Sequence, residues 1–187
     1  MWKQLFLDTI YRPQEAARSL LDLRLSSNEA WEALALASVL NALMFFITIT
    51  LFPPVGGFAI MIGSPIMMAL VLFVVMTVGA ASLFFTGRFL AGAAEFNDIL
   101  VMITWLQFMR LAVQVAGFVL MFLLPGLAGM AMFLAGLYGI WIMLNFLNVA
   151  QGFDSLGKTA GNLFFSFIAL TMILSVIFTV VGLSAIE

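Results

Sequence analysis

The sequence predicts an all-α, polytopic membrane protein: five transmembrane helices in one bundle, preceded by short amphipathic N-terminal helices. Two observations carry this prediction. Hydrophobic residues make up 65% of the 187 residues and charged residues 9%, against about 45–50% and about 25% in soluble globular domains. Basic residues also lie only in alternate gaps between long apolar runs, with a single exception near the middle of a run. The six in the gaps are Lys3, Arg12, Arg18, Arg24, Arg88 and Lys158.

Residues 1–29 predict a cytoplasmic amphipathic segment and not a secretory signal, because charges interrupt them at short intervals. Two interpretations stay open. The helices lie in the lipid headgroup region with Trp2 and Phe6 inserted, or their apolar faces pack on the protein's own cytoplasmic loops. Apolar residues recur at helical spacing on either side of Pro13, a favourable first helical residue. They are Trp2, Leu5, Phe6 and Ile10, then Ala17, Leu20, Leu21 and Leu25.

Residues 30–187 predict one transmembrane domain, and its first two spans have clear start signals. Ser26 as N-cap and Glu29 three residues later form a capping box before a span over about 31–51. Ser64 as N-cap and Pro65 at the first helical position begin a span over about 65–87. Each run is close to the ~20 residues that cross ~30 Å of hydrocarbon. We expect the apolar loop at 57–63 to dip into the membrane interface.

Three further apolar runs predict spans over about 99–124, 127–149 and 162–183, the first two separated by Pro125 and Gly126. Small residues share one face of the fourth span, which allows close approach of neighbouring helices. We therefore expect this span at the centre of the bundle. The small residues are Ala128, Ala131, Ala135 and Gly139.

The distribution of Lys and Arg predicts the orientation. Six basic residues fall in the gaps on one side and none in the short loops on the other. The positive-inside rule then places the N-terminus in the cytoplasm and the C-terminus outside. Five crossings, an odd number, place the two termini on opposite sides of the membrane, in agreement with this orientation.

Arg110 is the exception, about twelve residues into the third span and roughly 18 Å from its cytoplasmic end. Gln107 and Gln114 share its helix face by their spacing. At this depth a polar stripe faces the bundle interior or a wet cavity, because contact with acyl chains is unfavourable. Residues level with it on other spans are Asn41, Thr77 and Thr171. Together these six residues form a candidate intramembrane polar site.

Two roles for Arg110 stay open. In the structural role it snorkels toward an interface, or ties helices together through Gln and Asn side chains. In the functional role it creates an anion-attracting cavity. A lipid phosphate or a partner's carboxylate then supplies the negative charge that no mid-membrane Asp or Glu provides.

Residues Gly152–Thr159 match the P-loop pattern, yet we expect no nucleotide site there. The pattern binds phosphate when it joins a buried strand to a helix, with a separate Asp that holds magnesium. Here apolar spans flank it on both sides. A helix end at Gly152, a cap at Asp154 or Ser155 and a membrane anchor at Lys158 explain the segment instead.

The composition gives little support for catalysis. Histidine and cysteine are absent, which removes the commonest metal ligands, general bases and any thiol nucleophile. Neither paired carboxylates nor a serine–base arrangement can be assembled. We expect a non-enzymatic protein with no cofactor and no metal. The net charge of −2 gives no argument for a nucleic-acid partner.

Nearly the whole chain resembles a bacterial member of the Yip-one family, the Ypt/Rab-interacting type of five-span membrane protein. The resemblance rests on Pro13–Arg18, the Trp31 entry into the first span, Trp105–Gln107 with Arg110, Gly152–Phe153 and Ser155–Lys158. It implies a bacterial cytoplasmic (inner) membrane location. Eukaryotic members act in vesicle trafficking and bind Rab-type GTPases. Their Asp-Leu-Tyr-Gly-Pro motif is absent here, so GTPase binding does not carry over.

Two functions remain as hypotheses. The first is a non-enzymatic protein that organises membrane or binds a membrane partner, with lipids, another membrane protein or itself as partners. The alternative is a small transporter, channel or lipid-moving protein that uses the polar face around Arg110. A water-accessible cavity that reaches Arg110 favours the second function, and a dry, closed bundle favours the first.

Overall fold

The computed structural model describes residues 1–51 and 64–184, and every regular element in them is an α-helix. Five of these helices are long and apolar enough to cross a membrane. The predicted all-α class with five such helices is confirmed, while the loop expected at 57–63 lies outside the described residues. The helices are α1 (Trp2–Tyr11), α2 (Pro13–Leu21), α3 (Ser27–Leu51), α4 (Pro65–Phe89), α5 (Phe96–Leu123), α6 (Pro125–Gln151) and α7 (Leu156–Ser184).

The predicted start signals of α3 and α4 form as expected. The Glu29 carboxylate accepts hydrogen bonds from the backbone N–H and the hydroxyl of Ser26, both at 2.7 Å, and the Glu29 N–H donates to that hydroxyl at 3.4 Å. The Ser64 hydroxyl accepts from the Met67 N–H at 3.1 Å, with Pro65 as the first helical residue. Both caps satisfy amide groups that a helix start leaves without partners.

The later helices begin earlier than the apolar runs predict. A second capping box, Glu95 with Asp98, begins α5 at Phe96 and not at residue 99. Only Leu124 separates α5 from α6, because Pro125 is already the first residue of α6. The α7 helix starts at Leu156, six residues before the predicted span. Polar residues occupy these first turns, and hydropathy alone assigns such residues to loops.

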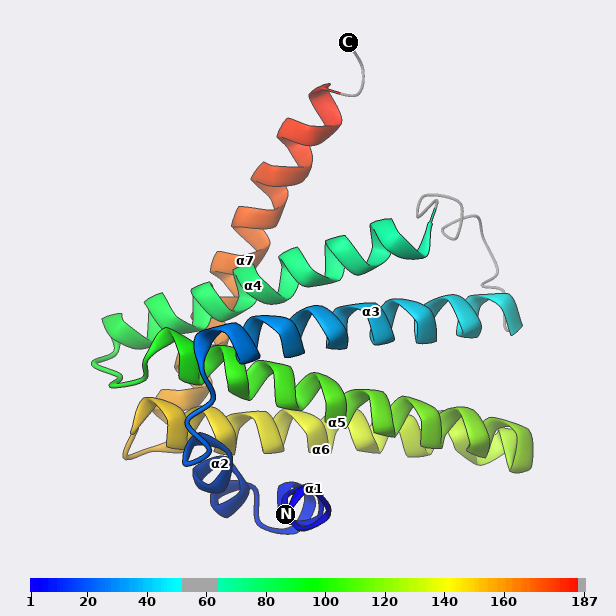
Figure 1. The fold of residues 1–187 in the computed structure, drawn as a ribbon, viewed down its shortest axis with the longest axis horizontal. Coiled ribbons are helices and arrows are strands. Elements are labelled where there is room, and N and C mark those ends of the chain that lie inside the picture. The colour runs from blue at the N-terminus through cyan, green and yellow to red at the C-terminus, as the bar shows by residue number, and fades with distance from the viewer. Residues whose placement is uncertain (52–63, 185–187) are drawn as a thin grey trace.

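Helices α3 to α6 run side by side along the length of the molecule, with α5 packed against α3, α4 and α6 (Figure 1). The expectation that the fourth span is central is therefore wrong. Ala128 of α6 is buried, but Gly139 is exposed, with open space where a Cβ would stand. The small-residue stripe packs over only part of its length, and α6 lies at an edge of the bundle.

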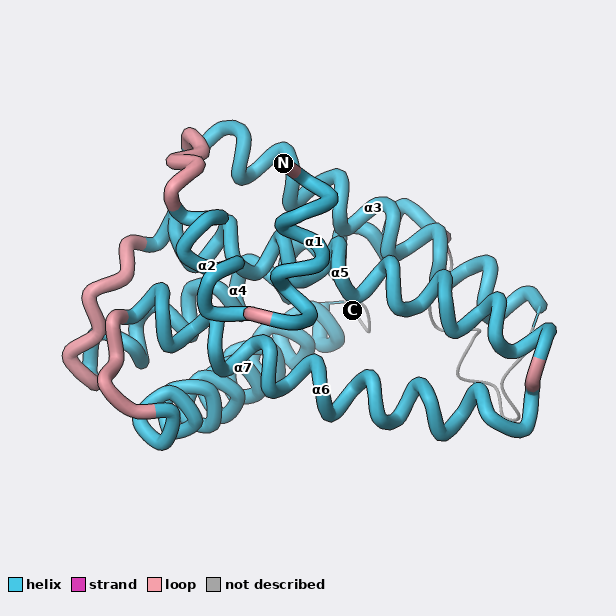
Figure 2. Tube along the Cα trace, turned by 90° about the horizontal axis from the view of Figure 1, so that it is seen from below, coloured by secondary structure: helices cyan, strands magenta, loops and turns pink. Residues whose placement is uncertain are grey.

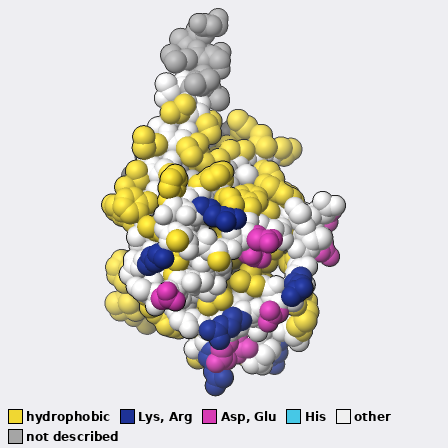
Figure 3. All heavy atoms as spheres, turned by 90° about the vertical axis from the view of Figure 1, so that its left-hand side faces the viewer, with side chains coloured by type: hydrophobic (Ala, Val, Ile, Leu, Met, Phe, Trp, Pro, Cys, Tyr) yellow, Lys and Arg dark blue, Asp and Glu magenta, His cyan; other side chains and the backbone are white. Residues whose placement is uncertain are grey.

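The buried apolar core lies toward one end of the bundle. We call this the charged end; there α4 passes into α5, and α6 into α7. Lys, Arg, Asp and Glu side chains gather on this end (Figure 3). Buried residues are dense here on each long helix, for example Leu34, Leu83, Ile99 and Phe146. Farther from this end the helices keep fewer buried side chains, which leaves room for a cavity.

The α7 helix diverges from the other long helices as it leaves the charged end (Figure 1). It packs mainly on α4 and α6 near its start. Farther along, large apolar side chains such as Met172 (66% exposed) and Val176 (63% exposed) have no covering helix among the described residues.

Helices α1 and α2 fold back onto the bundle, and α1 runs across the direction of α5 and α6 (Figures 1 and 2). Leu5, Thr9, Ala17 and Leu20 are buried in this contact. This contact agrees with the interpretation in which the apolar faces pack on the protein, whereas insertion into the lipid headgroup region stays a prediction. The inner face packs on the protein itself, on membrane helices and not only on loops. Phe6 on α1 is 37% exposed.

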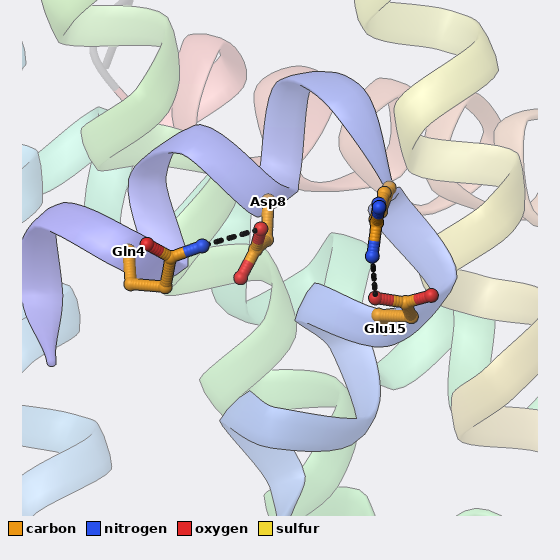
Figure 4. Close-up of polar contacts among 4 residues, drawn as sticks. Gln4, Asp8 and Glu15 are labelled. Atoms are coloured by element: carbon orange, nitrogen blue, oxygen red, sulfur yellow. Dashed lines mark hydrogen bonds and ion pairs between the residues drawn. The ribbon is translucent and has the colours of Figure 1, made fainter.

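Polar residues on the outer face of this N-terminal pair interact locally. Gln4 donates to the Asp8 carboxylate at 3.0 Å, and Arg12 pairs with Glu15 at 3.3 Å (Figure 4). Both partners in the ion pair are more than half exposed, so the pair adds at most about 1 kcal/mol of stability. Burial of the inner face, and not these contacts, holds α1 and α2 in place.

Candidate functional site

Arg110 lies near the middle of α5, about 20 Å from either end at 1.5 Å per residue. That distance is greater than its side chain extends, so the guanidinium stays within the span. Arg110 is exposed, and among the described residues it has no ion pair or hydrogen bond. The tie between helices through Gln107 or Gln114 is therefore not formed in this structure.

A cavity of about 500 Å³ opens beside Arg110, between α3, α4, α5 and α6. This volume falls within the range of about 300–1,000 Å³ that small-molecule sites occupy. Its walls are mostly apolar, and no acidic side chain from the described residues lines it. The polar lining consists of Asn41, Thr48, Arg110 and Gln114.

Two of these polar residues carry buried oxygens without partners. Asn41 is 7% exposed, and its amide nitrogen donates to the Ala37 carbonyl at 2.8 Å. Its amide oxygen, and that of Gln114, accept no hydrogen bond within the described part of the chain. An unsatisfied buried acceptor costs about 1–3 kcal/mol. Both residues line the cavity, but the two oxygens themselves are buried and not accessible from it, so Arg110 is the group that presents unused hydrogen-bonding capacity there.

The other three predicted site residues lie outside this cavity. Gln107 borders a second, more apolar cavity of about 300 Å³, where its amide donates to the Met76 sulfur at 2.8 Å. Thr77 has a buried hydroxyl without a partner among the described residues. Thr171 is exposed on the diverging part of α7, and its hydroxyl donates to the Phe167 carbonyl. Equal depth did not bring these groups together, because α7 leans away and Gln107 faces a different side of α5.

Sequence reasoning missed a polar cluster near the charged end. The Thr86 hydroxyl on α4 contacts Asn162 and Ser166 on α7, and Ser166 donates to the Ser82 carbonyl at 3.3 Å. Asn162 is fully buried and its amide nitrogen has no partner in the described structure. The spacing of Ser82 with Thr86, and of Asn162 with Ser166, was the available signal, since residues four apart share a helix face. Such contacts join membrane helices.

Gln151, the last residue of α6, is also part of this buried end. Its side-chain nitrogen donates to the Leu83 carbonyl at 3.2 Å, and its backbone carbonyl accepts from the Ala93 N–H at 2.9 Å. A Cβ at Gly87 or at Gly92 would lie 2.1 Å from Gln151 side-chain atoms. The glycines therefore provide the space that the Gln151 side chain fills.

The segment that matches the P-loop pattern connects two membrane helices. Gly152 ends α6 in the left-handed conformation, with φ of 64°. The Ser155 hydroxyl accepts from the N–H groups of Gly157 and Lys158 at the start of α7. The Lys158 ammonium lies 4.8 Å from the centre of the Phe153 ring. Gly152, Ser155 and Lys158 thus have structural roles in a helix–helix connection. Among the described residues, no group of three His, Cys, Asp or Glu side chains is placed to hold a metal ion.

A family model, the Yip1 domain, matches residues 7–178 and so covers all five long helices, with only the end of α7 beyond it. The chain belongs to the Yip1 (Yip-one) family. The Yip1 match includes α2 and the second half of α1, so it extends into the N-terminal helix pair. Searches of curated proteins and of solved structures found no match. The predicted family is confirmed, and the bacterial origin stays a prediction.

Proposed function

We propose that this Yip1 family protein is a non-enzymatic, lipid-handling membrane protein that binds an anionic lipid in the cavity beside Arg110. The observation that carries the proposal is the exposed guanidinium in the middle of α5, which has no partner among the described residues and lies next to a cavity that none of their acidic side chains lines. A mid-membrane Arg is unfavourable by about 2.5–3.5 kcal/mol on insertion scales. A phosphate about 4 Å away contributes on the order of 4 kcal/mol at an effective dielectric of ~20, which offsets that cost.

The cavity also bears on the choice between the two functions that the sequence leaves open. A dry, closed bundle was the feature expected of a protein that only organises membrane or binds a partner. The cavity that reaches Arg110 supports the transport, channel or lipid-moving alternative, and its mostly apolar walls favour a lipid over a hydrated ion. A lipid phosphate is the group that we propose neutralises Arg110, because no Asp or Glu of this chain lies at this depth.

Replacing Arg110 by Leu tests the proposal. Arg110→Leu should abolish co-purification of anionic lipid while keeping or raising the thermal unfolding temperature in detergent, and Arg110→Lys should be intermediate because it keeps charge but loses the planar fork. Gln107→Leu is the matched control, a polar residue of the same helix outside this cavity; lipid mass spectrometry should find its anionic lipid unchanged. Equal lipid content in Arg110→Leu and the wild type would refute the proposal. Destabilisation of Arg110→Leu with normal lipid content would favour the helix tie.

Organisation of the membrane surface by α1 is a second candidate function. Helix α1 lies beside the long helices and not beyond their ends, and it exposes Trp2, Phe6 and Leu7 (Figures 1 and 2). This geometry is typical of a helix that lies in the membrane interface. A fluorophore on a cysteine at position 6 should be quenched by nitroxide lipids labelled near the headgroup. Quenching only by a water-soluble agent would rule this role out.

The orientation belongs to the same proposal. We propose that the charged end faces the cytoplasm, with lipid taken from a bacterial inner membrane. The support is the set of six basic residues in the segments at that end, to which the positive-inside rule applies.

A further inference from the structure

We infer that Arg110 is reached from one end of the bundle only, and that its anionic lipid enters from the membrane leaflet at that end. This end lies opposite the charged end, where α3 ends, α4 begins and α5 passes into α6 (Figure 1). We call it the distal end. The identity of the ligand rests on the proposed function, whereas the route rests on the packing of the helices alone.

The cavity lies in the distal half of the bundle. On α5 it begins at Arg110 and extends to Met121, about 16 Å farther along the helix at ~1.5 Å per residue. No residue of α5 before Arg110 lines it. The other walls come from the second half of α3, the start of α4 and the first turns of α6. These segments all lie toward the distal end, so Arg110 marks the inner end of the cavity.

Packed side chains close the bundle between Arg110 and the charged end. Ser38 on α3, Met102 on α5 and Phe146 on α6 are buried in this region. Close-packed interiors contain few voids larger than a water molecule, so a hydrated anion or a lipid headgroup does not pass here. The second cavity, beside Gln107, shares no lining residue with the cavity of Arg110 and is a separate space.

The distal part of the cavity is exposed. Thr48, Met121 and Gly129 line it near this end, and all three are exposed, as Arg110 is. Arg110 thus has an exposed side chain in the middle of a span, with buried neighbours toward the charged end. Its contact with the surroundings therefore runs through the distal half of the bundle.

The distribution of charge favours the same direction. The sequence contains no Lys or Arg between Arg24 and Arg88, or between Arg110 and Lys158. These stretches include both connections at the distal end. An anionic headgroup in the distal leaflet therefore meets no basic residue of the connections before Arg110. In the other leaflet, the basic residues of the charged end attract the same headgroup at the membrane surface.

Labelling of a single cysteine from each side tests the route. The chain has no cysteine, so Arg110→Cys in the full-length protein, reconstituted in sealed liposomes, reports access to this position. Arg110 is about equally far from both ends of α5, so a difference between the two sides measures the route and not the depth. A membrane-impermeant methanethiosulfonate should react from the distal side at least about tenfold faster, because close packing blocks the other path.

Three further cysteines complete this measurement. Asp154→Cys, exposed on the connection between α6 and α7, reports which end faces outward. Ser38→Cys is nearly isosteric and lies in the packed region, so it should react slowly from both sides. Met44→Cys lines the cavity and keeps Arg110, so it should show the same difference if Arg110→Cys does not fold. Equal rates from both sides, faster labelling from the charged side or no labelling at all would overturn the inference.

A bulky group at the distal opening tests the entry of the lipid. Thr48 and Ile47 are neighbours on α3 and both are exposed, but of the two only Thr48 lines the cavity. A bulky maleimide adduct on Thr48→Cys should abolish the Arg110-dependent binding of added phosphatidylglycerol, measured by native mass spectrometry against the unmodified variant. The same adduct on Ile47→Cys should leave binding unchanged. Equal effects of the two adducts would overturn entry of the lipid through this opening.

The outcomes separate the route from the proposed function. Arg110-dependent lipid binding together with equal labelling from both sides would overturn the route and leave the proposed function standing. Lipid binding that does not change in Arg110→Leu would overturn the proposed function, and the labelling of Arg110→Cys would still decide the route. Inorganic phosphate should not displace the lipid. Displacement at comparable concentration would identify a free anion as the ligand and overturn the assignment to a leaflet.

Discussion

The indole nitrogen of Trp105 donates a hydrogen bond to the Thr9 hydroxyl at 3.0 Å, which joins the N-terminal helix α1 to the membrane helix α5. The same indole stacks on Trp2, with ring centres 6.1 Å apart. Trp105 lies about 14 Å along α5 from its start. The contact therefore holds α1 beside α5 and not beyond its end.

Trp105→Ala should release α1 from the bundle. It removes the hydrogen bond and the stacked ring, together worth about 1–3 kcal/mol. The chain has no cysteine, so a single Leu5→Cys reports the release: Leu5 is 5% exposed, and its maleimide labelling should accelerate severalfold in Trp105→Ala. Tyr11→Cys, at a position 76% exposed, should label quickly in both backgrounds. Unchanged labelling at position 5 would show that burial alone holds α1.

Gly87→Ala should destabilise the protein even though alanine is the better helix former by about 1 kcal/mol. The new Cβ would lie 2.1 Å from the Gln151 side chain, and such overpacking typically costs about 1–3 kcal/mol. Thermal unfolding in detergent measures the effect. Gly136→Ala, where a Cβ meets nothing within 4 Å, should be neutral or stabilising. Gln151→Ala should relieve part of the cost in the double variant, and additivity of the two changes would disprove the steric explanation.

Lys158→Gln should leave folding nearly intact, because Lys158 contacts the Phe153 ring at an exposed position. Ser155→Ala should be worse, by about 0.5–2 kcal/mol, since the hydroxyl that caps α7 is lost. Thermal unfolding in detergent measures both variants, and the unfolding temperature of Ser155→Ala should be lower than that of Lys158→Gln. Magnesium-dependent ATP or GTP binding that Lys158→Gln abolishes would overturn our interpretation of Gly152–Thr159.

Reporter fusions test the orientation. Fusions after Arg24, near Asn97 and near Lys158 should report the cytoplasm, because the basic residues flank these positions. Fusions at Gly57, at Gly126 and at the C-terminus should report the opposite side. A cytoplasmic C-terminus would mean that one of the five helices does not cross.

Much of the fold could be predicted from local sequence. Five apolar runs, the Ser26–Glu29 capping box and the Ser64–Pro65 start all depend on residues close together in the chain, and all formed as expected. The position of Arg110 within a span depended on the same local signals. The helix starts at Phe96 and Leu156 were missed because their first turns contain polar residues, which a search for apolar runs leaves out.

The sequence by itself determined the class of protein, the number of long helices and the presence of a charge in the middle of α5, since hydropathy and capping are local properties. Only the tertiary structure decided which polar groups meet. Asn41 and Gln114 line the cavity of Arg110, while Gln107 and Thr171 do not. The depth of a residue along a span follows from its position in the sequence. The direction in which its side chain points depends on the rotation and tilt of the helix. Those are fixed by packing between distant segments, such as Gln151 against Gly87 and Trp105 against Thr9.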